Sequence, residues 1–104
     1  MFTGSEDHDI SLADAAVMTK LYRQSLPEGS CKGGFFGRDA IESLLAQDDC
    51  VGIRYYHGID SKGEPVIILV GVDENEDDLI DGQLLEFAIP CPNQCGAGNV
   101  LNGI

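Results

Sequence analysis

A continuous apolar run near the middle of the chain constrains the fold more than any other feature. Residues 65–72 read Pro-Val-Ile-Ile-Leu-Val-Gly-Val and carry no charged side chain. A strand with apolar side chains on both faces must be covered on both sides, which is typical of a central strand. We therefore expect this segment at the centre of a small sheet.

The segments on either side predict the rest of that sheet. From Cys50 onward apolar and other side chains alternate until a turn at residues 60–63, Asp-Ser-Lys-Gly, which is half of a hairpin. Residues 83–89 alternate again before Pro90 ends the strand. A three-stranded antiparallel meander is the expected arrangement.

Two helices are expected before the sheet. Ser11 and Asp14 match a capping box, and apolar side chains then recur every fourth residue until Pro27 stops the helix. Residues 38–47 place four apolar side chains on one face of a shorter helix, after a glycine-rich connector at 33–37. The predicted fold is α+β: two N-terminal helices packed on the three-stranded meander, with an irregular C-terminal tail.

Length and charge limit the organisation and the partners. The 104 residues fit a single domain over 1–104, with a flexible N-terminal arm at 1–10 and a cysteine-containing tail at 90–104. With 18 acidic and 6 basic residues the formal charge is −12, which disfavours nucleic acids and anionic membranes and favours cations or basic protein surfaces. No signal peptide or membrane-spanning run is present, so we expect a cytoplasmic protein.

The chemically most specific stretch is a Cys-x3-Cys turn formed by Cys91 and Cys95. The two thiols could bind a metal, form a redox disulfide, or pack as small apolar groups that fix the tail, and the sequence leaves these roles open. A zinc site would need two further ligands. The candidates are Cys31, Cys50, His57 and His8. We expect no cofactor, with zinc as the alternative.

The acidic segment 73–81 resembles the start of a calcium-binding loop. Its oxygen ligands for a weak cation site would be Asp73, Asn75, Asp77 and Asp81. The match fails at the sixth position, where Asp78 replaces the glycine, and at the twelfth, where Leu84 replaces the glutamate. A solvated connection between strands is the competing interpretation.

Several motifs together resemble a known family. They are Met18-Thr19-Lys20-x-Tyr22-Arg23, Gly33-Gly34-Phe35-Phe36-Gly37, the segment 47–58, Leu69-Val70-Gly71-Val72-Asp73, and Cys91-Pro92-x-x-Cys95-Gly96 with Asn99 and Leu101. Over nearly its whole length the chain resembles a family of small uncharacterised bacterial proteins that end in this Cys-Pro-x-x-Cys-Gly motif. The resemblance implies a complete, freestanding protein, and it implies no activity or catalytic residue.

Enzyme signatures are sparse. The chain has no Gly-x-Ser-x-Gly motif, and only His8 and His57 could act as bases near neutral pH. Our hypothesis is a non-catalytic binding or regulatory module that works through protein–protein contacts, and the alternative is a thiol redox or zinc protein.

The expected contact surface of this module is the sheet face away from the helices. Tyr55 is expected to face the helices together with Ile68. The interface candidates on the opposite face are Tyr56, Ile67, Leu69 and Leu84. A homodimer is the expected assembly.

Overall fold

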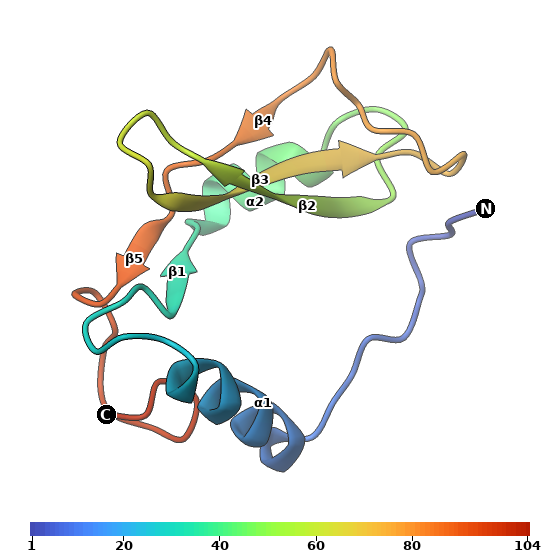
Figure 1. Ribbon diagram of the computed structural model, residues 1–104. Coiled ribbons are helices and arrows are strands. Elements are labelled where there is room, and N and C mark those ends of the chain that lie inside the picture. The colour runs from blue at the N-terminus through green and yellow to red at the C-terminus, as the bar shows by residue number, and fades with distance from the viewer. The chain divides into compact units, whose positions relative to one another are not determined.

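The computed structural model describes residues 1–104 and confirms the α+β fold class (Figure 1). The chain divides into two compact units. The first unit contains Met1–Asp7 and Phe36–Ala88, and the second contains His8–Phe35 and Ile89–Ile104. Neither helix has the length and apolar content needed to cross a bilayer.

The apolar run forms the central strand of the first unit's sheet, as predicted. Strand β3 (Pro65–Val72) lies between β2 (Gly52–Ile59) and β4 (Leu84–Leu85), and both pairs are antiparallel. The hairpin turn is also confirmed. The Asp60 carboxylate accepts hydrogen bonds from the backbone N–H groups of Lys62 and Glu64, both at 2.9 Å, and Gly63 takes the positive φ of 82° that the turn requires.

The third strand is shorter than the alternation predicted. Only Leu84–Leu85 pairs with β3. Phe87 has a φ of 62°, a left-handed conformation that turns the chain out of an extended strand, and its side chain is 89% exposed. The prediction of one continuous strand over 83–89 was therefore wrong in its extent.

The register of the hairpin corrects the predicted faces of the sheet. Tyr55 lies opposite Leu69, and Tyr56 lies opposite Ile68. Since paired residues share a face, Tyr55 belongs with Leu69 and Ile67, whereas Tyr56 belongs with Ile68. Leu84 lies opposite Val70 and joins the Tyr56 face. The four interface candidates Tyr56, Ile67, Leu69 and Leu84 are thus divided between two faces.

The core of the first unit is small. Helix α2 (Arg38–Leu45) contacts β2 and β3, and its Leu44 is fully buried. Val70 and Val72 on β3 are the other buried hydrophobic side chains, exposed by 1% and 3%. The N-terminal residues, expected in a flexible arm, contact this unit: the Phe2 N–H donates to the Glu74 carbonyl at 2.9 Å.

Gln47, two residues after α2, connects the helix to the loop that precedes β4. Its side-chain Nε2 donates to the Leu44 carbonyl at 2.8 Å, and its Oε1 accepts from the Gln83 N–H at 2.8 Å. One side chain therefore bonds a carbonyl at the helix end and a backbone N–H beside the sheet.

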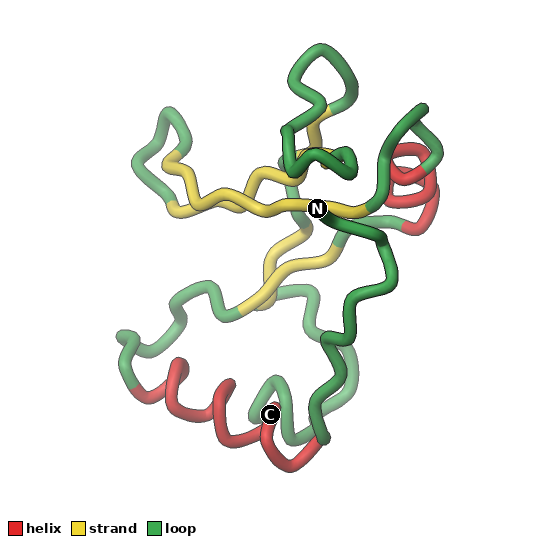
Figure 2. Tube along the Cα trace, turned by 90° about the vertical axis from the view of Figure 1, so that its right-hand side faces the viewer, coloured by secondary structure: helices red, strands yellow, loops and turns green.

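The second unit contains helix α1 (Leu12–Gln24) and a two-stranded antiparallel sheet. Ser11 caps α1 as predicted, because its hydroxyl accepts from the Asp14 N–H at 3.0 Å. Strand β1 (Gly33–Phe35) pairs with β5 (Ile89–Cys91), although the sequence indicated a flexible connector at 33–37. Figure 2 shows that most of this unit outside α1 and the two strands is loop.

No residue of α1 is buried. Its predicted apolar stripe is more than half exposed at Val17, Met18, Leu21 and Tyr22. The best-covered residues lie instead on the side of Ala15, Ala16, Thr19 and Arg23, which are half-buried.

Candidate functional site

The Cys-x3-Cys turn follows β5 and is closed by a disulfide. Cys91 ends β5, and its Cα atom lies 4.8 Å from that of Cys95 in the Cys91–Cys95 disulfide. Within the turn the Gln94 N–H donates to the Pro90 carbonyl and the Cys95 N–H to the Asn93 carbonyl, both at 3.1 Å. Of the roles that the sequence left open, the structure contains the disulfide.

The other candidate zinc ligands do not complete a metal site with this pair. Cys31 is an exposed thiol whose Sγ donates to the Gly33 carbonyl at 3.2 Å, and Cys50 makes the equivalent bond to Gly52 at 3.3 Å. His57 packs edge-on against Tyr55, with 5.5 Å between ring centres. The structure contains no group of three or more His, Cys, Asp and Glu side chains placed to hold a metal ion.

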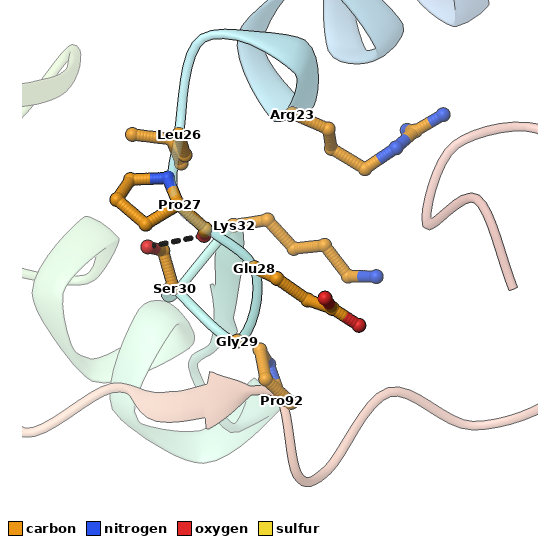
Figure 3. Close-up of a pocket in the computed structure, with 8 residues that line it drawn as sticks. All are labelled: Arg23, Leu26, Pro27, Glu28, Gly29, Ser30, Lys32 and Pro92. Carbon is orange, nitrogen blue, oxygen red and sulfur yellow. Dashed lines mark hydrogen bonds between the residues drawn. The ribbon is translucent and has the colours of Figure 1, made fainter.

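A hollow of about 170 Å³ lies in the second unit, and Figure 3 shows the side chains around it. It is lined by Arg23, Leu26, Pro27, Glu28, Gly29, Ser30, Lys32 and Pro92. Its two cations hold the C-terminal tail: Arg23 Nη1 donates to the Leu101 carbonyl at 2.7 Å, and Lys32 Nζ to the Asn102 carbonyl at 2.5 Å. The hollow therefore lies beside the hydrogen bonds that connect the C-terminal tail to the end of α1 and to the segment before β1.

The acidic loop folds around one of its own side chains. The Asp73 carboxylate accepts from the backbone N–H groups of Asn75 and Asp77, at 2.9 and 3.1 Å. That oxygen acts as a turn cap within the loop. Asp81 lies away from it, in the lining of a second hollow with Gln47 and Asp78.

Asp78, the residue that interrupts the calcium-loop pattern, joins a polar cluster across the sheet. It pairs with Val72 in an isolated bridge, which places it on the face that carries Arg54 and Tyr56. Its carboxylate accepts from Arg54 Nη1 and from the Tyr56 hydroxyl, each at 2.5 Å. The alternation of Arg54 and Tyr56 on one face was visible in the sequence, but their partner more than twenty residues away was not.

The cluster keeps Asp78 ionised. The hydrogen bond from the Tyr56 hydroxyl, and then that from the Arg54 guanidinium, lower the pKa of the Asp78 carboxyl below its ordinary value. The same contact with Asp78 raises the pKa of Arg54. Arg54 and His57 lie on opposite faces of the sheet, so His57 is not part of this cluster.

We expect the Asp78 cluster to stabilise the fold in a pH-dependent way. Because its pKa is depressed in the folded state, the stabilisation is complete above the unfolded value of about 3.9 and is lost as the pH falls through the lower folded value. Asp78→Asn should therefore have a lower urea midpoint than the wild type at pH 7, and the difference should shrink below about pH 4.

The control for this measurement is Asp77→Asn, at an exposed neighbouring residue. This variant should follow the wild type at every pH. If Asp78→Asn and Asp77→Asn have the same urea midpoint at pH 7, the cluster does not contribute to stability.

The opposite face of the sheet is apolar and largely uncovered. We call it the open face, and its exposed residues are Ile53, Tyr55, His57, Ile59 and Ile67, while Leu69 and Leu85 on the same face are half-buried. Tyr55 is 61% and Ile59 77% exposed. Near Gly71 this face is covered by other side chains, because a Cβ on that glycine would contact Gln47, Cys50 and Leu79. The open face therefore presents large apolar side chains in a row.

These features are the structural basis for any functional assignment. They comprise the Cys91–Cys95 turn, the Asp78 cluster and the open face of the first unit. No family model matches the chain, and no similar curated protein or solved structure was found.

Proposed function

We propose that the protein is a non-catalytic cytoplasmic module that acts through protein–protein contacts, and that the open face is its contact surface. The observation that carries this proposal is the row of exposed apolar side chains, in particular Tyr55 and Ile59, on one side of β2. Exposed apolar patches on small proteins commonly mark interaction sites, and tyrosine is enriched in such sites.

The partner that we propose is a second copy of the chain. Packing two open faces against each other would bury the exposed apolar side chains of both copies, including Tyr55 and Ile59. Residues 52–59 contain one arginine and one histidine and no acidic residue, in a chain with a formal charge of −12. Two open faces can therefore approach each other without bringing acidic side chains of β2 together, and one surface packed on its own copy has the two-fold symmetry of a closed dimer.

A pair of isoleucine substitutions tests the proposal. Ile59 and Ile80 belong to the same unit and are similarly exposed, by 77% and 71%, but only Ile59 lies on the open face. We expect the wild type and Ile80→Asp to sediment as dimers at micromolar concentration and Ile59→Asp to sediment as a monomer of 11.1 kDa, because the new carboxylate would be buried in the interface.

The same experiment separates this proposal from its structural alternative. In the packing predicted from the sequence both helices lie on the sheet, so that α1 would cover an apolar face with its stripe at Val17, Met18, Leu21 and Tyr22. In that case the wild type would be a monomer, and Ile59→Asp would lower its stability more than Ile80→Asp. A monomeric wild type in which both variants are equally stable would leave the open face without a role.

A second candidate function is thiol redox chemistry, and the Cys91–Cys95 disulfide favours it. A disulfide that closes so short a loop restricts the unfolded chain only modestly, by about 2 kcal/mol, which is compatible with reversible oxidation. Zinc binding by the same pair would first require its reduction, because thiolates are the zinc ligands.

A further inference from the structure

Three of the four cysteines belong to the second unit. Cys91 and Cys95 form the disulfide, and Cys31 is a free, exposed thiol two residues before β1. Figure 1 shows β1 and β5 side by side, so that the segment before β1 runs beside the turn after β5. The free thiol and the disulfide are therefore neighbours in space although 60 residues separate Cys31 from Cys91.

Backbone contacts fix this neighbourhood. Gly33 pairs with Cys91, and the Lys32 N–H donates to the Cys91 carbonyl at 2.8 Å. Summing this hydrogen bond with the standard bond lengths on either side places the Cα atoms of Cys31 and Cys91 at most about 8.4 Å apart. Disulfides span Cα separations up to about 7 Å, so a small shift of the loop that carries Cys31 is enough to bring the sulfurs together.

The direction of the side chains supports the same approach. Cys31 and Gly33 are two residues apart, and Gly33 is the direct partner of Cys91. Cys31 precedes the paired residues of β1, and continuing the alternation of the strand by one step would place its side chain on the side of Gly33 and Cys91. Since Gly33 has no side chain, nothing in the β1 ladder stands between Cys31 and Cys91 on that side.

We propose that Cys31 is the attacking thiol of an intramolecular thiol–disulfide exchange with the Cys91–Cys95 pair. The Cys31 thiol first loses its proton to solvent, and its thiolate attacks Cys91 Sγ. The Cys31–Cys91 bond forms, the Cys91–Cys95 bond breaks, and Cys95 leaves as a thiolate that takes up a proton. One disulfide and one thiol are present before and after, so no external oxidant or reductant is needed.

This inference goes beyond protein binding and deepens the redox candidate, because it names the route by which the disulfide is reached. Cys91 and Cys95 are both half-buried, whereas Cys31 is exposed. Exchange moves the disulfide onto the exposed cysteine, where the thiol of another molecule can attack it. Cys31 is then the entry point for electrons, and Cys95 is the thiol that becomes free.

Cys50 provides a matched control within the same chain. Its thiol makes the same local hydrogen bond as that of Cys31, to the carbonyl two residues further on, at 3.3 Å compared with 3.2 Å. Cys50 belongs to the first unit, and the disulfide belongs to the second. The two free thiols therefore have the same local bonding, and Cys31 is the one whose segment is bonded to Cys91.

The test identifies which cysteine carries the free thiol. Full-length Cys50→Ser protein, purified without reductant, is held at pH 8, denatured at pH 6 with N-ethylmaleimide, and analysed by tandem mass spectrometry. We expect the single label to be divided between Cys31 and Cys95. In Cys31→Ser protein the label should remain on Cys50, and labelling of Cys95 should fall to background.

Three results would overturn the proposal. Label on Cys31 alone in Cys50→Ser protein would show that no exchange occurs, while the disulfide and the redox candidate would stand. Label on Cys91 instead of Cys95 would show that the other sulfur is attacked. Label on Cys31, Cys91 and Cys95 together would mean that the disulfide is not formed, which also removes the redox candidate. The sedimentation of Ile59→Asp is independent of all three.

Discussion

Replacing Leu44 with alanine is expected to lower the free energy of unfolding by about 2 to 5 kcal/mol, which is a large fraction of the stability of a small domain. Leu44 has no exposed surface and is the one buried residue of α2. Leu44, Val70 and Val72 are the buried hydrophobic side chains, so truncating Leu44 removes a large share of the buried apolar volume and leaves a cavity. Urea denaturation followed by circular dichroism measures the change.

Leu45 is the control for this substitution. It follows Leu44 in the same helix and is 44% exposed. Leu45→Ala deletes the same atoms at a half-solvated position, so it should cost clearly less than Leu44→Ala. Equal losses would mean that α2 is not packed through Leu44, and a loss below about 1 kcal/mol for Leu44→Ala would exclude that residue from the core.

The elements that could be predicted from the sequence are those fixed by local chemistry. The cap of α1 could be predicted because Ser11, directly before the helix, carries a hydroxyl that can accept from the first turn. The central position of β3 could be predicted because the strand has apolar side chains on both faces. The hairpin turn at Asp60 follows from a carboxylate that can bond the next two free N–H groups. Each of these depends on residues within a few positions of one another.

The faces of the sheet could not be predicted in the same way. Alternation divides the side chains of each strand into two sets, but only the register between the strands decides which sets lie on the same face of the sheet. A shift of one residue exchanges the faces completely. The observed register pairs Tyr55 with Leu69, and this is why Tyr56 and Leu69, predicted on one surface, lie on two.

Long-range pairing was the other source of error. The sequence predicts that a strand ends at Ile89 and a tail begins at Pro90, yet Ile89–Cys91 pairs with Gly33–Phe35. Nothing within either segment indicates the other, because a three-residue strand with two glycines has no pattern to detect. The disulfide was one of the alternatives that the sequence left open, and the approach of Cys31 to it depends on this pairing.

The second large effect is expected at Gly71, where an added methyl group should lower the free energy of unfolding by about 1 to 3 kcal/mol. The glycine is buried in β3, and a Cβ there would lie 2.9 Å from Gln47 Nε2, 3.0 Å from Cys50 Sγ and 3.2 Å from Leu79 Cδ1. The nearest of these atoms cannot move freely, because the Gln47 side chain is held by its bonds to Leu44 and Gln83. In Gly71→Ala either the new methyl group stays too close to Gln47, or the Gln47 side chain moves and loses its hydrogen bonds at the end of α2.

Gly52 on the neighbouring strand gives the opposite expectation. A Cβ at this position would meet no atom within 4 Å, and its φ is not in the positive region. Gly52→Ala should leave stability unchanged or raise it by up to about 1 kcal/mol, because alanine reduces the conformational freedom of the unfolded chain. Denaturation of both variants under one condition therefore tests the packing of Gln47 against β3. A Gly71→Ala protein as stable as Gly52→Ala would mean that the end of α2 does not lie on that face of the sheet.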